Sequence, residues 1–142
     1  MIRMLVLLLT AMTLSMAASA QGKLPKFNAY PATVEKARAK KIDFRRSPGA
    51  GSFRTRLSES LREGTDFAGH YKIAGWGCGT GCISGAVIDM RNGRVYFPEE
   101  FYALSVGYFS GDYESEPLKY KVNSRLLIIS GIPGRADNKP DQ

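Results

Sequence analysis

Both cysteines of the chain lie in one short segment, together with its single histidine and its single tryptophan. The segment runs from His70 to Cys82 and reads His-Tyr-Lys-Ile-Ala-Gly-Trp-Gly-Cys-Gly-Thr-Gly-Cys. Thiols and an imidazole in one place can form a disulfide, bind a metal ion, exchange electrons, or act as nucleophile and base. Any chemistry that the protein performs is therefore expected in this segment.

The setting of the two thiols favours a disulfide between Cys78 and Cys82. Gly79 and Gly81 allow the chain to curl tightly enough to bring the two Cβ atoms to about 3.8 Å, as a disulfide requires. Two cysteines in a small domain usually form a disulfide in an oxidising compartment, which an exported protein reaches. Because the closed loop is so short, the bridge would fix local shape and contribute at most about 2 kcal/mol.

Other uses of these residues are less well supported. A redox-active pair is more often Cys-x-x-Cys at a helix N-terminus, and the glycines here disfavour a helix. A zinc site needs about four ligands, whereas Cys78, Cys82 and His70 supply three, so we expect no metal and no cofactor. A nucleophilic cysteine activated by His70 would tend to oxidise beside its neighbour. The loop also lacks the Lys-Ser/Thr and the following helix of a phosphate-binding loop.

An enzymatic role for His70 would need an acid beside its imidazole. Asp66 is the candidate, but two residues four apart along a strand lie about 13 Å from each other on the same face. Their side chains meet only if the chain bends between them. A cell-envelope hydrolase that uses His70 is therefore an alternative hypothesis, and a strand histidine hydrogen-bonded within the fold is the simpler one.

The favoured hypothesis is a non-enzymatic binding or inhibitory module. A glycine-rich loop with one large aromatic residue suits recognition of a partner. We expect Trp76 to be exposed beside the disulfide-stapled loop, with His70, Tyr71 and Thr80 as further contact residues. A purely structural envelope protein is the third hypothesis.

The first twenty residues have the pattern of a cleavable export signal. Arg3 provides a positive start, residues 4–16 are apolar apart from three hydroxyl residues, and Ala-Ser-Ala at residues 18–20 is a small-x-small cleavage site. The apolar run is too short to cross roughly 30 Å of hydrocarbon comfortably. The residue directly after the cleavage site is Gln21 and not a cysteine, so no lipid anchor is expected there. No later segment approaches 18 apolar residues. We therefore expect a periplasmic or secreted protein without a transmembrane segment after cleavage.

Positive charge is concentrated in the first half of the chain. Residues 21–62 contain 11 Lys and Arg against 3 Asp and Glu, whereas residues 63–142 contain 8 against 10. Six of the basic residues fall between Lys36 and Arg46, just before a Ser-Pro-Gly-Ala-Gly stretch that is typical of a loop. We expect residues 21–51 to form a solvated basic arm ahead of the domain, able to contact an anionic envelope component or an envelope protein. Nucleic acid is disfavoured, because the chain is exported and the arm lacks interleaved aromatics for base stacking.

One helix is clearly predicted. With 44% hydrophobic and 11% aromatic residues the chain is too apolar to be disordered, and its length supports one domain. Apolar residues recur at every fourth position from Phe53 to Leu61, which predicts a helix over residues 53–63. Ser52 is the candidate N-cap and Gly64 the candidate stop. The narrow apolar stripe suits packing against one face of a sheet.

After this helix the pattern changes to strands. Alternating or apolar runs predict five strands, at residues 67–74, 83–90, 94–97, 118–122 and 126–129. Asn92-Gly93 marks the turn of one hairpin, and Asn123-Ser124 that of another. Two hairpins and one packed helix give an antiparallel α+β domain over residues 52–134, with one small sheet of about five strands. Residues 101–113 read as a long ordered loop, and residues 135–142 as a frayed polar tail.

Three motifs occur together in this domain. They are Asp-Phe-Ala-Gly-His-Tyr at residues 66–71, Trp-Gly-Cys-Gly-Thr-Gly-Cys at residues 76–82, and an apolar strand that ends in Asp-x-x-x-Gly at residues 89–93. In these motifs the chain resembles a family of small exported proteobacterial proteins to which no activity is assigned. The resemblance covers about residues 53–131. It implies export and a shared fold, and it carries over no catalytic residue.

We expect signal removal to leave Gln21 as the first residue of the exported protein, because Ala18 and Ala20 fit the small pockets of a signal peptidase. Intact-mass or N-terminal analysis of the exported protein checks this. A retained Met1, or a start beyond Lys26, would contradict it.

Overall fold

The protein is described by a computed structural model, which covers residues 24–36, 38–106 and 116–134. Within these ranges it contains one α-helix, six β-strands and four short 3-10 helices. The helix and strands are α1 (Arg54–Glu63), β1 (Tyr71–Gly79), β2 (Cys82–Asp89), β3 (Val95–Tyr96), β4 (Leu104–Ser105), β5 (Leu118–Tyr120) and β6 (Leu127–Ile129). The 3-10 helices are η1 (Phe27–Ala29), η2 (Phe44–Arg46), η3 (Ala50–Phe53) and η4 (Glu99–Phe101). The predicted α+β class with one helix is confirmed.

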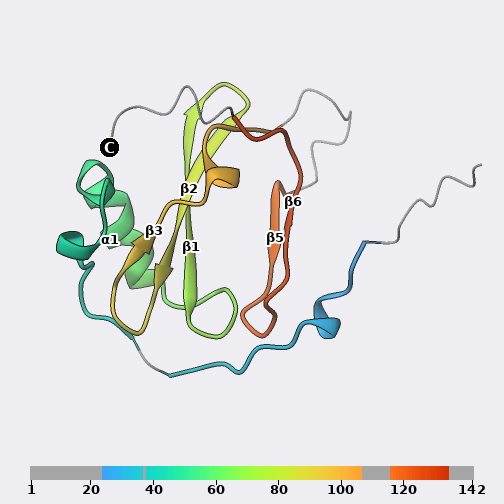
Figure 1. Cartoon of the computed structure of the whole chain (residues 1–142), viewed down its shortest axis with the longest axis horizontal. Helices are drawn as coiled ribbons and strands as arrows, with labels where there is room; N and C mark the ends of the chain where they lie inside the picture. The colour runs from blue at the N-terminus through green and yellow to red at the C-terminus, as the bar shows by residue number, and fades with distance from the viewer. Residues whose placement is uncertain (1–23, 37, 107–115, 135–142) are drawn as a thin grey trace, which may run out of the picture.

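The strands form two antiparallel sheets rather than the single sheet that was expected (Figure 1). β1 and β2 make a long hairpin, and β3 and β4 pair with opposite ends of β2. β1 is therefore an edge strand of the four-stranded sheet. β5 and β6 pair only with each other among the described strands, and their sheet stands beside β1. β4 lies in the segment that was expected to be a loop.

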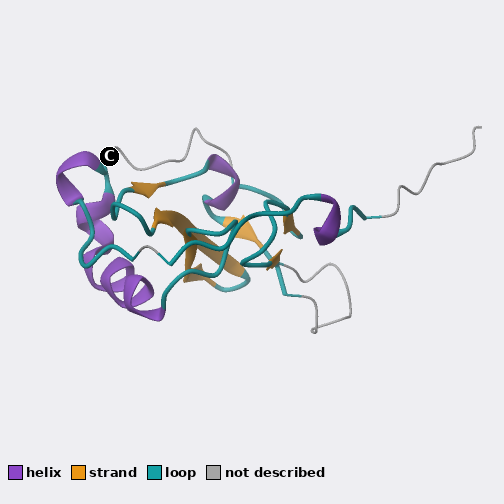
Figure 2. Cartoon of the chain, turned by 90° about the horizontal axis from the view of Figure 1, so that it is seen from below, coloured by secondary structure: helices purple, strands orange, loops and turns teal. Residues whose placement is uncertain are grey.

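The helix lies where the apolar repeat predicted it, to one side of the strands (Figure 2). Leu57 and Leu61 are buried against the sheet, and Gly64 ends the helix with a φ of 94°. The prediction of Ser52 as N-cap is wrong. Ser52 lies within η3, which runs directly into α1, and no side chain in the described part of the chain caps this helix. No helix in the same ranges is long and apolar enough to cross a membrane.

The first strand begins later than predicted, because the chain reverses direction just before it. Phe67 and Tyr71 exchange backbone hydrogen bonds across a tight turn. Gly69 lies in this turn with a φ of 86°, and a Cβ there would overlap the carbonyl oxygen of Thr33. Only glycine fits both constraints. β1 is consequently displaced along the chain, and the glycine-rich segment that was expected to be a loop forms its second half.

The expectation of a solvated basic arm is wrong for the part of residues 21–51 that the structure describes. In Figure 1 this segment runs beneath both sheets towards α1. The backbone N–H groups of Ala39 and Asp43 donate to carbonyl groups of the β2–β3 turn. Ile42 and Ala50 are buried in the core, Ala50 with no exposed surface. The basic side chains of this segment are exposed, whereas Ile42 and Ala50 are buried between and after them. The segment therefore packs on the domain while its charges stay in water.

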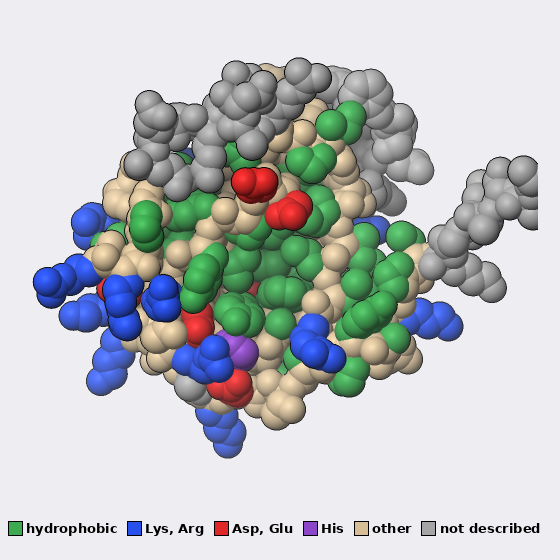
Figure 3. All heavy atoms as spheres, viewed as in Figure 1, with side chains coloured by type: hydrophobic (Ala, Val, Ile, Leu, Met, Phe, Trp, Pro, Cys, Tyr) green, Lys and Arg blue, Asp and Glu red, His purple; other side chains and the backbone are tan. Residues whose placement is uncertain are grey.

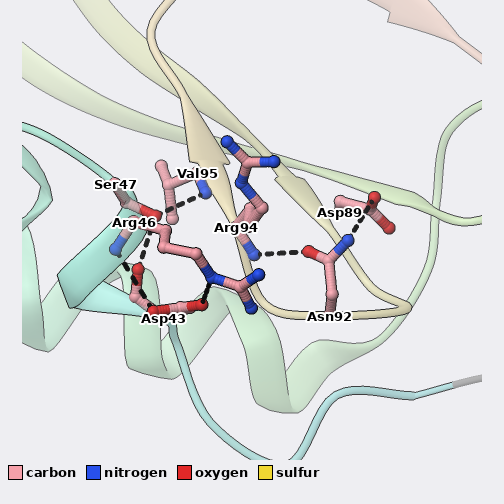
Figure 4. A network of polar contacts seen from close by, with 7 residues as sticks. All are labelled: Asp43, Arg46, Ser47, Asp89, Asn92, Arg94 and Val95. Atoms are coloured by element: carbon pink, nitrogen blue, oxygen red, sulfur yellow. Dashed lines mark hydrogen bonds and ion pairs between the residues drawn. The ribbon is translucent and has the colours of Figure 1, made fainter.

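Figure 4 shows the polar contacts that attach this segment to the β2–β3 hairpin. Ser47 is 1% exposed, and its Oγ donates to the carbonyl of Asp43 (2.6 Å) and accepts from the N–H of Val95 (3.0 Å). The carboxylate of Asp43 in turn accepts from the backbone N–H and the guanidinium of Arg46. The two bonds of Ser47 satisfy a hydroxyl and a backbone N–H that packing removes from water, whereas the pair of Asp43 and Arg46 lies at the surface.

The β2–β3 turn lies where Asn92-Gly93 predicted it, and Asp89 closes it. Its carboxylate accepts from the backbone N–H of Arg91 (2.9 Å) and the side-chain amide of Asn92 (2.9 Å). Burial alone would raise the pKa of Asp89, but the hydrogen bonds and positive charge of Arg91 outweigh it and hold the pKa below its usual value. The turn therefore carries a carboxylate that stays ionised.

The core lies between α1 and the face of the sheet formed by even-numbered residues of β1 and β2. Trp76 is 9% exposed and stacks on Phe53 with ring centroids 4.5 Å apart. Ala74 and its β2 partner Ala86 lie beside them in the same cluster. Small residues in the strands thus make room for the indole against the helix.

We expect Trp76→Ala to lower the free energy of unfolding by about 3–5 kcal/mol, because it removes a buried ring and leaves a cavity. Trp76→Phe should cost less, since an aromatic ring can still stack on Phe53. Chemical denaturation measures both variants. The wild-type fluorescence should be strongly blue-shifted, and emission typical of a solvent-exposed indole would contradict the burial.

Candidate functional site

The two cysteines close the tip of the β1–β2 hairpin. The disulfide between Cys78 and Cys82 is present, with Cα atoms 5.2 Å apart, so the predicted pairing is confirmed. The strands continue to the tip, where Gly79 pairs directly with Cys82. Gly79 and Gly81 have φ values of 140° and 64°, which L-residues with a side chain rarely adopt. The glycines therefore make a turn tight enough for the bridge.

The hairpin tip, defined here as residues 77–80, is exposed at all four positions. Three of these residues are glycine or cysteine, so backbone groups make up much of its surface. Below the tip, Val106 N–H donates to the carbonyl of Gly81 (2.8 Å) and joins the hairpin to the end of β4. The tip is consequently held by a covalent bridge, a strand ladder and a neighbouring strand.

Trp76 does not belong to the exposed surface, and the expectation of an exposed aromatic anchor is wrong. Successive side chains of a strand point to opposite faces, and the even-numbered residues of β1 face α1. Trp76 follows that alternation into the core, where it contacts Phe53. The indole therefore anchors the hairpin just before its tip to Phe53, at the start of the helix, and leaves the tip itself free.

His70 lies at the opposite end of β1 from the tip, in the turn that precedes the strand. Its Nδ1 is 3.0 Å from a carboxylate oxygen of Glu35, and its ring contacts that of Tyr71. Its Nε2 is buried and has no hydrogen-bond partner in residues 24–36, 38–106 and 116–134. A general base must reach the proton that it removes, and a nitrogen that is buried without a hydrogen-bond partner is poorly placed for this. The contact with Glu35 instead joins the N-terminal segment to the domain.

Asp66 makes other contacts than the one considered for catalysis. One of its carboxylate oxygens accepts from Lys72 Nζ (2.8 Å) and from the hydroxyl of Tyr120 (3.3 Å). Lys72 also pairs with Glu63 at the end of α1 (2.7 Å). Burial alone would lower the pKa of Lys72, but hydrogen bonds to Asp66 and Glu63 outweigh it and raise the pKa above its usual value. Helix, first strand and second sheet meet at this cluster.

The four predicted binding residues are thus not brought together. Thr80 lies at the exposed tip, Trp76 lies in the core, and His70 and Tyr71 lie at the far end of β1. Among the described residues, no group of three or more His, Cys, Asp or Glu side chains is arranged to hold a metal ion. The candidate site is therefore the tip and whatever surface adjoins it on β1.

A cleft of about 430 Å³ lies between the middle of β1, at Ile73 and Gly75, and β5. Its described lining residues are Ile73, Gly75, Glu116, Pro117, Leu118 and Tyr120. Sequence reasoning missed this cleft, because it exists only where two separate sheets stand side by side. The repeated glycines of β1 were visible as a signal, but they were interpreted as loop residues.

Comparison of the chain with protein-family models, with curated proteins and with solved structures finds no match. The resemblance to exported proteobacterial proteins accordingly stays a prediction.

We expect the Cys78→Ser, Cys82→Ser double variant to lose about 1–2 kcal/mol of unfolding free energy, less than a usual disulfide because the closed loop is so short. Denaturation of the variant and of the reduced wild type should agree. Thiol labelling of the wild type should require prior reduction. Equal labelling with and without reductant, or complete loss of folding in the variant, would contradict this account.

Proposed function

We propose that this protein is a non-enzymatic binding module and that its hairpin tip contacts the partner. The observation that carries the proposal is the exposure of four successive residues on a hairpin that is fixed from two sides. The Cys78–Cys82 disulfide closes the tip, and the stacking of Trp76 on Phe53 fixes the part of β1 that leads into it. A preorganised surface loses little conformational entropy on binding, which favours affinity.

The proposed place of action is the periplasm or the exterior of the cell. Disulfides form and persist in oxidising compartments, so the bridge agrees with the export pattern of residues 1–20. An envelope protein is the partner that this location offers. The hydrolase hypothesis receives less support, because Nε2 of His70 is buried and Asp66 is engaged by Lys72 and Tyr120.

A second partner class, an anionic envelope component, is supported by the end of the molecule that carries α1. Figure 3 shows Lys and Arg side chains gathered at this end. Two segments that meet near α1 contribute exposed basic residues: Lys36, Arg38, Lys40, Lys41, Arg45, Arg46, Arg54, Arg56 and Arg62. Packing joins the segments, since the Arg38 guanidinium donates to the carbonyl of Arg62 and Arg54 lies 4.0 Å from the centroid of the Phe44 ring. One basic surface of this kind attracts anions more strongly than two separate ones.

We expect Thr80→Arg to abolish capture of an envelope partner by the exported protein, because a long charged side chain at the tip obstructs a contact made at the tip. Thr55→Arg is the matched control, since Thr55 is an exposed threonine on α1. Both variants should keep a Tm within a few degrees of the wild type. Crosslinking in envelope extract followed by quantitative mass spectrometry measures capture. Equal capture by the two variants would exclude the tip as the contact surface.

A further inference from the structure

The outer edge of β1 is unpaired beside the cleft. Residues along an edge strand turn their backbone groups alternately towards the neighbouring strand and away from it. Tyr71 bonds to Phe67 on the side away from β2, so the odd-numbered residues of β1 face outward. The outward N–H of Ile73 donates to a side-chain carboxylate (2.9 Å). The next two outward residues, Gly75 and Gly77, make no outward backbone hydrogen bond to any described part of the chain.

β5 presents a second free edge on the other side of the cleft. The carbonyl of Pro117 accepts from the N–H of Ser130, so the odd-numbered residues here bond towards β6. Leu118 and Tyr120 therefore turn their backbone groups away from β6, and both line the cleft. In Figure 1, β5 is the strand of its sheet that lies on the β1 side. The cleft is thus bordered by unpaired backbone on both walls.

The cleft is open at one end and closed at the other. A Cβ built on Gly75 or Gly77 would meet nothing within 4 Å, so the β1 wall is bare towards the hairpin tip. At the opposite end, Gly69 N–H donates to the carbonyl of Val122 (2.6 Å) and joins the turn before β1 to the β5–β6 turn. Figure 3 shows hydrophobic side chains on the surface between the two sheets. A chain could enter from the tip and lie along both strands.

We propose that this cleft binds an extended segment of a partner protein, which adds a strand between β1 and β5. The inference rests on the proposed binding function and names how the partner is held. An extended backbone offers N–H and C=O groups to both walls at strand spacing. An acyl chain would leave the same groups without partners, at a cost in desolvation. Gly77, the next outward residue of β1, lies between the cleft and Thr80, so a bound strand that is longer than the cleft would extend towards the tip.

The lining residues indicate which segment fits. Ile73, Pro117 and Leu118 offer apolar contact to one or two side chains of the added strand. Glu116 is the one charged residue among the described lining residues, and it favours a Lys or Arg opposite it. A Pro-free segment that combines β-forming residues with a basic residue is therefore the expected ligand.

A second copy of this chain does not fit the cleft. The strand that enters must be free of neighbours on both of its edges, because β1 and β5 occupy both sides. In a second copy β1 is bonded to β2, and β5 is bonded to β6. Pairing of two β1 edges would bring the second sheet of each molecule against the other. The occupant is consequently a segment that is extended and unpaired before it binds.

The test is selection from a displayed library of random decapeptides on the exported protein, followed by titration of the selected peptides. Gly75→Pro removes the outward N–H of this edge without touching the bonds to β2, and proline is tolerated on an edge strand. Gly75→Ala is the matched control, since its N–H remains and its Cβ meets open space. We expect the peptides to bind the wild type and Gly75→Ala alike, and to bind Gly75→Pro about ten-fold more weakly. Glu116→Lys should reverse the preference for basic peptides.

Amide hydrogen exchange by NMR gives a second readout that needs no variant. The N–H groups of Gly75 and Gly77 should exchange fast in the free protein and become protected when a selected peptide is added. A library without binders, unchanged affinity in Gly75→Pro, or amides that are already protected in the free protein would each overturn the proposal. So would a dimer in analytical ultracentrifugation that Gly75→Pro dissociates.

The two proposals fail in different ways. If Thr80→Arg abolishes partner capture while Gly75→Pro leaves it intact, the hairpin tip binds the partner and strand addition is wrong. If the selected peptides protect Gly75 and Gly77 while Thr80→Arg captures normally, the cleft binds peptides and the tip is not the contact surface.

Discussion

The burial of one ammonium group links the parts of this molecule. Lys72 is 9% exposed, and removing its charge from water is costly unless opposite charges compensate. Asp66, in the turn before β1, and Glu63, at the end of α1, provide that compensation. Through the hydroxyl of Tyr120, Asp66 also holds the second sheet. The position of β5 beside β1, and with it the cleft, depends on these charges meeting at one point.

From Lys72 onward, the alternation of β1 divides the strand into two roles. The even-numbered residues carry the side chains that pack on α1, and Trp76 is the largest of them. The outward backbone groups belong to the odd-numbered residues, and beyond Ile73 these are glycines. One strand can therefore be tightly packed on its inner face and bare along its outer edge. The register of β1 and β2 shifts between Gly77 and Gly79, and the disulfide closes the hairpin at this irregularity.

Features that depend on neighbouring residues could be predicted from the sequence. The apolar repeat of α1, the stop at Gly64, the Asp89 turn and the Cys78–Cys82 bridge each follow from a few adjacent residues. Features that depend on distant contacts could not. The burial of Trp76 requires α1 to lie over β1, and the cleft requires the hairpins to form separate sheets. Nothing in the spacing of Asp66 marks Tyr120 as its partner.

The attachment of the N-terminal segment has a consequence for the order in which the fold is completed. The hydroxyl of Ser124 lies 2.8 and 3.0 Å from the carbonyl oxygens of Phe27 and Tyr30, and Pro31 pairs with the same residue. A chain that emerges N-terminus first cannot place these early residues until the β5–β6 turn has followed them. The β1–β2 hairpin can form well before that, because its contacts join residues close in sequence. Such contacts cost less chain entropy to form than contacts between distant residues. Closure of the domain is therefore a late event, and a nascent chain stopped before residue 124 would hold a formed hairpin while Phe27, Tyr30 and Pro31 still lack their attachment.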